Sequence, residues 1–216
     1  MLAATGERGD EQRRDPQVAR SAPTKSQRTR QRILDSAARV FRDQGYSARL
    51  SDIAAEAGMQ AGSLYYHFDS REHLVAEVLH RGTEIAWDSA RAAVDALPAD
   101  ASAGLRLETA IRAHAAAVLE ISDYTAAHTR ILSMASAEVR EREHTHERRY
   151  GAWFGDLLTA AADAGDIRAD LDLPVVRMLL FGAMNWTSEW YRPGDVRPAS
   201  HVIDQLVELV LGGLRR

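Results

Sequence analysis

Residues Ser51–Phe68 have the sequence SDIAAEAGMQAGSLYYHF, and this stretch decides the architecture expected for the whole chain. Apolar residues at helical spacing, among them Ile53, form one face of a short helix over about 50–57. Gly58 ends that helix, and another short helix follows over about 61–68. Two short helices joined by a tight, glycine-containing turn are typical of a helix-turn-helix unit, whose second helix enters the major groove of DNA.

The second of these helices holds several aromatic side chains. At about 100° per residue, Leu64 and Phe68 share a face with Ala61, so we expect this face to pack on a core. Tyr65 lies at the edge of that face. Three residues point away from it, namely Ser63, Tyr66 and His67. Exposed aromatic side chains with polar tips are typical of contact surfaces rather than of cores.

The rest of the sequence also shows helical periodicity. No stretch alternates apolar and polar residues with the period of two that a half-buried strand requires, so we predict an all-α fold. Glycines and prolines such as Gly45 and Pro98 mark the ends of helices. The further helices are expected over about 28–44, 71–97, 103–121, 124–133, 137–164, 174–190 and 199–214.

The composition excludes several classes of protein. The 216 residues include no cysteine, so a disulfide or a thiolate metal site cannot form. No apolar leader is present, and no apolar run approaches the roughly 20 residues that a membrane helix needs. We therefore expect a cytoplasmic protein with no membrane partner, no metal and no cofactor.

Charge is distributed unevenly along the chain, whose net charge is −4. Residues 1–50 hold eleven Lys and Arg against six Asp and Glu, whereas the remainder holds sixteen against twenty-five. A basic front end on an acidic body favours contact between the front end and a polyanion. Residues 1–26 are polar and lack periodicity, which predicts a disordered basic arm.

Residues 33–79, ILDSAARVFRDQGYSARLSDIAAEAGMQAGSLYYHFDSREHLVAEVL, resemble the DNA-binding domain of TetR-family transcriptional regulators. The resemblance implies a three-helix helix-turn-helix domain over 27–75, joined by a fourth helix to a larger helical ligand-binding and dimerisation domain over 76–216. It also implies a function: a dimeric regulator, most often a repressor, that binds double-stranded operator DNA and is released by a small, largely apolar effector.

The resemblance assigns DNA contacts residue by residue. The residues nearest the base edges would be Gln60, Ala61, Gly62 and Ser63, and Ser51 is placed where some members reach a base. Tyr65 would contact a thymine methyl group. Contacts to phosphate or to the minor groove are implied for Tyr66, His67, Arg71 and Arg28.

One position departs from the family pattern. The family usually has a threonine just before the second helix, where it caps the helix and contacts phosphate, whereas this chain has Arg49. Ser47 is an alternative cap, or the cap is lost. Arg49 would then supply a phosphate contact of its own.

The last two helices are suited to dimerisation. Their apolar residues surround most of the helix over 174–190 and form a broad stripe on the helix over 199–214, which indicates burial on two sides. An ordinary monomeric core is the alternative explanation. The residues assigned to the dimer interface are Met178, Phe181, Val202, Leu206, Leu209 and Val210.

The segment GAMNWTSEWYRPG, residues 182–194, is unusual for a plain bundle helix because Asn185 and Thr187 interrupt an apolar run. Two interpretations remain open: a dimer seam with tryptophan anchors, or one wall of an effector pocket. Its ending resembles that of TetR-family regulators of fatty-acid and steroid breakdown, which respond to acyl-CoA thioesters. Candidate effector-binding residues along the chain are His114, Val118, His128, Met134, Trp153, Leu157, Trp186 and Trp190.

The segment EREHTHERR, residues 141–149, raises the question of a metal site. His144 and His146 are two residues apart, so they point to different sides of a helix and chelate poorly. We interpret the segment as a solvated charged face. No nucleophile elbow, metal pair or phosphate loop is present, which argues against an enzyme. An architectural DNA-binding protein without an effector remains the alternative, although DNA binding alone requires far less than the 216 residues.

Overall fold

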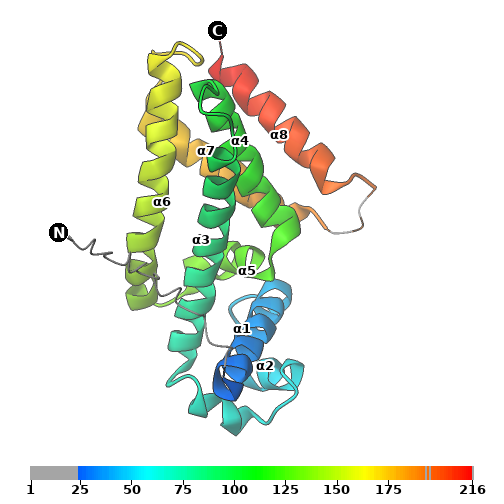
Figure 1. Ribbon diagram of the computed structural model, residues 1–216. Helices are drawn as coiled ribbons and strands as arrows, with labels where there is room; N and C mark the ends of the chain where they lie inside the picture. The colour runs from blue at the N-terminus through cyan, green and yellow to red at the C-terminus, as the bar shows by residue number, and fades with distance from the viewer. Residues whose placement is uncertain (1–23, 193, 195, 216) are drawn as a thin grey trace, which may run out of the picture.

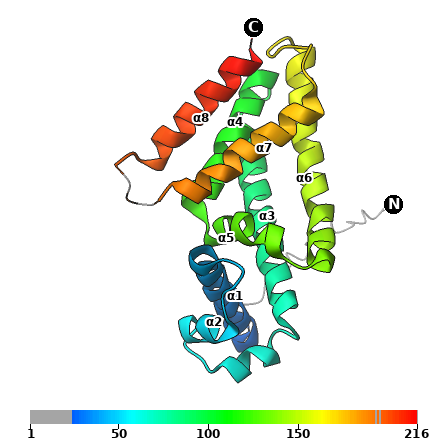
Figure 2. The same cartoon turned by 180° about the vertical axis from the view of Figure 1, so that it is seen from behind.

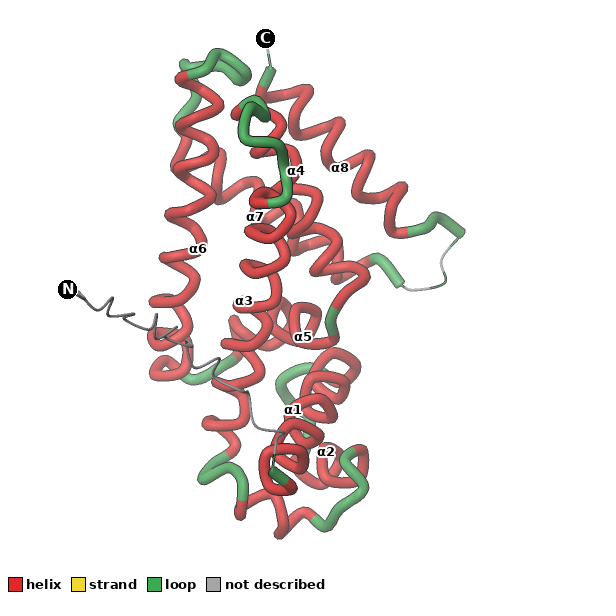
Figure 3. Tube along the Cα trace, in the orientation of Figure 1, coloured by secondary structure: helices red, strands yellow, loops and turns green. Residues whose placement is uncertain are grey.

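The computed structural model describes residues 24–192, 194 and 196–215, and every regular element within them is helical (Figures 1 and 3). The predicted all-α fold is therefore confirmed. The elements are α1 (Lys25–Gln44), α2 (Leu50–Glu56), η1 (Ala61–Tyr66), α3 (Arg71–Asp95), α4 (Ala103–Ala116), η2 (Ala117–Ile121), α5 (Asp123–Ile131), η3 (Leu132–Met134), α6 (Ala137–Asp163), α7 (Leu173–Trp190) and α8 (Ala199–Leu214).

Helix α1 begins a little earlier than expected. The Thr24 hydroxyl accepts a hydrogen bond from the Gln27 N–H at 3.2 Å, and the Gln27 side-chain oxygen accepts one from the Thr24 N–H at 2.7 Å. This reciprocal capping box satisfies two N–H groups at the start of the helix. The arm predicted over 1–26 therefore ends before Lys25, and residues 1–23 of that prediction lie outside the described residues.

Helix α2 is not capped by Ser47. The Ser47 hydroxyl donates instead to the Gln44 carbonyl at 3.5 Å. The Asp52 carboxylate, in the first turn of α2, accepts a hydrogen bond from the Arg49 N–H at 3.3 Å. A carboxylate at this end of a helix is also favoured by the helix dipole, so α2 starts at its expected position despite lacking the family's threonine.

The helix that follows the turn is a 3₁₀ helix rather than an α-helix. At its end, the N–H of the capping residue His67 donates to the Leu64 carbonyl, three residues earlier, at 2.9 Å. A 3₁₀ helix turns by about 120° per residue, so face assignments made for an α-helix do not all apply. Leu64 and Phe68 are buried as predicted, but Ala61 is exposed, and its predicted packing on the core is wrong.

Helix α3 connects two hydrophobic cores. Its first half, including Leu74 and Val78, packs with α1, α2 and η1, which together we call the reading head. Its second half, including Ala90, packs with α4, α6, α7 and α8. Figures 1 and 2 show α3 running up the molecule from the reading head, with α4 and α6 on its two sides and α7 crossing the bundle.

Helix α5 completes the core of the reading head from the other domain. Tyr124 is buried in that core, and its hydroxyl donates to Asp35 of α1 at 2.7 Å. On α3, Gly82 allows α5 to approach closely, because a Cβ there would lie 2.7 Å from the Tyr124 carbonyl oxygen. The predicted boundary after residue 75, between a DNA-binding domain and a ligand-binding domain, stays a prediction. Hydrophobic packing continues across this position.

Candidate DNA-reading surface and effector cavity

The turn between α2 and η1, together with η1, lies at the lower end of the molecule in Figure 1. Most of its side chains are exposed. Tyr66 is 89% exposed and Tyr65 is 59% exposed, so neither ring fills a core. The other predicted base-edge and phosphate residues of this segment are exposed, as Gln60, Ala61 and Gly62 are, or half-buried, as Ser63 and His67 are. Arg28, Arg49 and Ser51 are exposed as well. The predicted DNA contacts of these residues stay predictions.

Arg71 has a structural role that the sequence did not indicate. Its guanidinium donates hydrogen bonds to the carbonyls of Tyr46 and Ala48, and it lies 4.3 Å from the centroid of the Tyr46 ring. It therefore ties the start of α3 to the loop between α1 and α2. Because part of its donor capacity is committed to the fold, replacing Arg71 would loosen the reading head as well as remove any phosphate contact.

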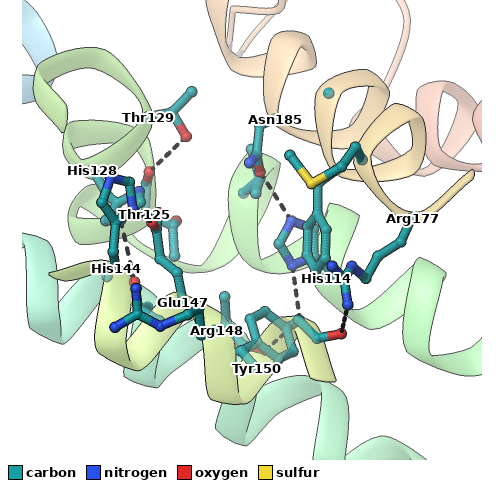
Figure 4. Close-up of a pocket in the computed structure, with 18 residues that line it drawn as sticks. His114, Thr125, His128, Thr129, His144, Glu147, Arg148, Tyr150, Arg177 and Asn185 are labelled. Carbon is teal, nitrogen blue, oxygen red and sulfur yellow. Dashed lines mark hydrogen bonds and ion pairs between the residues drawn. The ribbon is translucent and has the colours of Figure 1, made fainter. Parts of the chain in front are cut away.

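A cavity of about 560 Å³ lies among α3, α4, α5, α6 and α7. This volume falls in the range of roughly 300–1,000 Å³ that is usual for small-molecule sites. The polar side chains that line the cavity all belong to helices. Figure 4 shows the lining residues and labels ten of them. The cavity is therefore a candidate effector site between the helices of the bundle.

Three side chains from three helices form a buried hydrogen-bonded chain on the cavity wall, with His114 between Asn185 and Tyr150 (Figure 4). His114 is 4% exposed, and both of its ring nitrogens lie 2.9 Å from a partner. Burial lowers the pKa of His114 to about 4, although the hydrogen bond to Asn185 opposes this shift. Burial also raises the pKa of Tyr150 far above its ordinary value.

These two shifts keep His114 neutral and Tyr150 protonated at neutral pH. A neutral imidazole donates through one nitrogen and accepts through the other. Because Asn185 presents its Oδ1, the His114 Nε2–H donates to it, and the Tyr150 hydroxyl donates to His114 Nδ1. The cavity wall thus holds a protonated phenol, a neutral histidine and an amide.

A second polar network joins α3, α5 and α6. The Thr83 hydroxyl donates to the Glu143 carboxylate at 2.5 Å and lies 3.2 Å from His128 Nε2. His128 Nε2 is also 3.6 Å from a carboxylate oxygen of Glu147. Burial of Glu143 acts to raise its pKa, but the nearby His128 imidazole and the hydrogen bond from Thr83 outweigh it, so the pKa lies below its ordinary value. A buried carboxylate with such partners is satisfied and rigid.

The structure brings three of the predicted effector residues to the cavity: His114, Val118 and His128. The other five do not line it. Trp153 and Leu157 pack partly buried against the second core. The remaining three lie at the surface, where Met134 is 66% exposed, Trp186 66% and Trp190 54%. Helical spacing identifies a face but does not tell which neighbouring helix covers it, and this explains why five candidates lie elsewhere.

Several lining residues were missed, among them Tyr150, Arg177 and Glu147. The segment over 141–149 is also more than a solvated charged face, because Glu143 is buried and other members line the cavity. The sequence did contain a signal for the lining residue Asn185, because it is a polar residue within an apolar run. Among the described residues, no group of three or more histidine and acidic side chains is placed to hold a metal ion.

Helices α7 and α8 expose an unpartnered apolar face. Large apolar side chains of α7 are exposed at helical spacing, namely Val175, Met178, Leu179, Trp186 and Trp190, and Leu209 of α8 is 78% exposed. Of the residues assigned to dimerisation, Met178 and Leu209 are exposed, and Met178 also lines the edge of the cavity. Phe181 instead packs against the rings of His114, Tyr150 and Phe154, and Val202 is buried with Tyr191 and Ala199. Leu206 and Val210 pack partly buried on the second core.

No helix in the described part of the chain is long and apolar enough to cross a membrane.

Comparison with known proteins agrees with this architecture. Residues 33–78 match the family of bacterial regulatory proteins, tetR family, and residues 100–214 match the tetracyclin repressor-like C-terminal domain. The HTH-type transcriptional repressor KstR2 of Mycolicibacterium smegmatis is 30% identical over 204 residues, which cover 91% of this chain and 96% of that protein. The KstR2 of Mycobacterium tuberculosis strain H37Rv is 33% identical over 190 residues, 85% of this chain and 92% of that one.

Solved structures show the same fold. The ketosteroid transcriptional regulator KstR2 of Mycobacterium tuberculosis superimposes with a TM-score of 0.74 at 28% identity, over 87% of this chain and 95% of that one. AibR in complex with isovaleryl coenzyme A and operator DNA gives a TM-score of 0.75 at 22% identity, over 84% and 97% of the two chains. The chain therefore belongs to the TetR family of bacterial regulatory proteins, and it is a DNA-binding transcriptional regulator rather than an enzyme.

Proposed function

We propose that the protein is a homodimeric, cytoplasmic repressor that leaves its operator when a small, largely apolar effector fills the cavity. The observation that carries this proposal is the position of the cavity. Its wall includes Gly82 and Thr83 of α3 and His128 of α5, and these two helices also complete the core of the reading head. A molecule that spreads the cavity wall therefore acts on the helices that position η1.

The mechanism is an equilibrium between two orientations of the reading heads. Operator DNA favours the spacing that places both η1 helices in successive major grooves, about 34–36 Å apart. The effector favours another orientation by displacing α3 against α5. By thermodynamic linkage, the effector weakens DNA binding by the same factor by which DNA weakens effector binding.

The dimer is proposed to form through the exposed apolar face of α7 and α8. Six large apolar side chains exposed on two adjacent helices exceed what a monomeric surface usually carries without a partner. A twofold axis through this face would place two reading heads on one palindromic site. Trp186 to alanine is expected to weaken the dimer, which sedimentation velocity would report.

Relatives suggest which compounds to test first. The relatives that match this chain include a ketosteroid transcriptional regulator of Mycobacterium tuberculosis. They also include a fatty acid metabolism regulator protein of Bacillus subtilis, which is 23% identical over 84% of this chain. The sequence around Trp190 and Tyr191 also resembles regulators that respond to acyl-CoA thioesters. Acyl-CoA thioesters of lipid and steroid breakdown, and the corresponding free acids, are therefore the first class for a screen.

The experiment combines a thermal-shift screen with DNA binding. The operator is first selected from random duplex DNA by the purified full-length protein, and the screen then identifies compounds that raise its melting temperature. A compound that stabilises the protein is expected to release it from the selected duplex. Stabilising compounds that leave DNA affinity unchanged would contradict the proposal, and failure to enrich any sequence would favour the architectural alternative.

A further inference from the structure

One face of α7 carries a cation, an aromatic ring and an amide into the cavity. Arg177, Phe181 and Asn185 occupy positions i, i+4 and i+8 of the helix, and all three line the cavity. Figure 4 shows Arg177 and Asn185 there. Residues at this spacing share one side of a helix. With a rise of 1.5 Å per residue, Arg177 and Asn185 are separated along the axis by about 12 Å.

The guanidinium of Arg177 lies across α6 without a counter-charge. It donates to the Gly151 carbonyl at 3.1 Å, and a Cβ added at Gly155 would lie 3.4 Å from its Nη1. Two glycines one turn apart thus provide a flat surface for the guanidinium. Among the described residues, no carboxylate lies within ion-pair distance of Arg177, whose printed partner is the Gly151 carbonyl. A half-buried cation of this kind is stabilised by an anion.

Asn185 lies at the other end of this face of α7, and its side-chain N–H group has no acceptor among the described residues. Its Oδ1 lies 2.9 Å from His114 Nε2, and the Tyr150 hydroxyl lies at the other ring nitrogen of His114. Its Nδ2 hydrogens meet no acceptor among the described residues, and Asn185 lines the cavity. A polar donor that faces a cavity is satisfied by a ligand or by water.

The middle of this face of α7 is rigid and apolar. The Phe181 ring contacts those of His114, Tyr150 and Phe154, with centroids 5.3, 5.5 and 5.1 Å away. Phe154 is fully buried, so Phe181 rests on a fixed wall. The ligand-facing surface between Arg177 and Asn185 therefore favours a hydrocarbon body over a polar one.

We propose that the effector is an elongated anion, whose negative group pairs with Arg177, whose apolar body lies along Phe181, and whose far end accepts a hydrogen bond from Asn185. The proposal rests on the function proposed above, because it assumes that the effector occupies this cavity. The negative group is either the carboxylate of a free acid or a phosphate of a coenzyme A thioester. Both supply the anion that Arg177 requires.

The test uses the full-length protein and four defined probes. These are an unbranched carboxylic acid of about ten carbons with a ketone near its far end, its methyl ester, the same acid without the ketone, and the coenzyme A thioester of the oxo acid. Calorimetry measures their affinities. The oxo acid or its thioester is expected to bind at least tenfold more tightly than the uncharged ester, and the oxo acid severalfold more tightly than the plain acid.

Variants assign each preference to its residue. Arg177→Gln is expected to abolish the preference for charge over ester, and Arg177→Lys to restore part of it. Asn185→Asp keeps an oxygen for His114 but removes the donor, so the affinity ratio of oxo acid to plain acid is expected to fall to about one. Arg168→Gln is the matched control, because Arg168 is paired with Asp170 outside the cavity.

The outcomes separate this inference from the proposed function. If the ester binds as tightly as the acid and the thioester while still displacing operator DNA, the function stands and the role of Arg177 is wrong. If Arg177→Gln alters dimerisation but leaves the probe preference intact, Arg177 is structural and the inference is again wrong. If no probe binds and none affects DNA binding, both the function and the inference are contradicted. Dependence on Arg177 for the thioester but not for the free acid would assign the charge to a phosphate, which supports the inference.

Discussion

Gly82 offers the sharpest test of how the reading head is connected to the effector cavity. A Cβ at this position would lie 2.7 Å from the Tyr124 carbonyl oxygen and 2.8 Å from His128 Cβ. One neighbour is a backbone atom and the other is a Cβ bonded directly to the backbone, so neither can rotate away. Gly82→Ala must therefore push α3 and α5 apart at their crossing.

The size of the effect follows from two opposing contributions. Alanine favours a helix interior over glycine by about 0.8–1 kcal/mol. Forcing an additional carbon into a packed contact costs about 1–3 kcal/mol, and contact with backbone places this site toward the upper end. The net loss of unfolding free energy is thus about 1–2 kcal/mol, which lowers the melting temperature of a chain of this size by about 2–8 °C.

Differential scanning calorimetry measures the change, with Gly212→Ala as the matched control. Gly212 has no atom within 4 Å of an added Cβ, so alanine there is expected to be neutral or slightly stabilising. Gly82→Ala should also change operator affinity, because α3 and α5 position the reading head. A Gly82→Ala protein as stable as Gly212→Ala would refute the tight crossing and the coupling that is built on it.

Three further predictions follow from burial and charge. Tyr66→Ala should weaken binding to selected and random DNA alike without lowering the melting temperature, since Tyr66 is 89% exposed; a large loss of stability would show that it belongs to the core. Phe154→Ala should cost about 3–5 kcal/mol in urea denaturation, because the ring is fully buried, and a loss below about 1 kcal/mol would mean that the ring cluster is loose. Because burial lowers the pKa of His114 from its ordinary value of 6.5 to about 4 in the folded chain, the unfolded chain binds more protons between these two values. The free energy of unfolding should therefore fall by roughly 3 kcal/mol as the pH drops through that window, and His114→Gln should remove most of the fall.

Local signals were sufficient to predict the helices and the reading head. Gly45, Gly58 and Pro98 mark chain reversals or helix ends, and the apolar period identified Leu64 and Phe68 as core. These features depend on neighbours in sequence, so periodicity and capping chemistry report them directly. The 3₁₀ form of η1 was missed, because the same residues are compatible with an α-helical turn.

The cavity could not be predicted to the same extent, because its lining depends on which helix faces lie together. Trp153 is a large aromatic residue of the kind that often lines a pocket. In the structure it packs instead against Tyr150 of its own helix and against the core. Arg177 gave no sequence signal, since its position depends on Gly151 and Gly155 of another helix. Asn185 was visible as a polar interruption, but its partner His114 lies 71 residues away in the chain.

The central claim is that effector and operator compete through α3 and α5. The most direct measurement is a complete thermodynamic cycle: the operator affinity with and without saturating effector, and the effector affinity with and without saturating operator, on the same full-length protein. Both ratios are expected to be equal and well above one. If the effector binds with the same affinity to the free protein and to its operator complex, the cavity does not control DNA binding and the account is wrong.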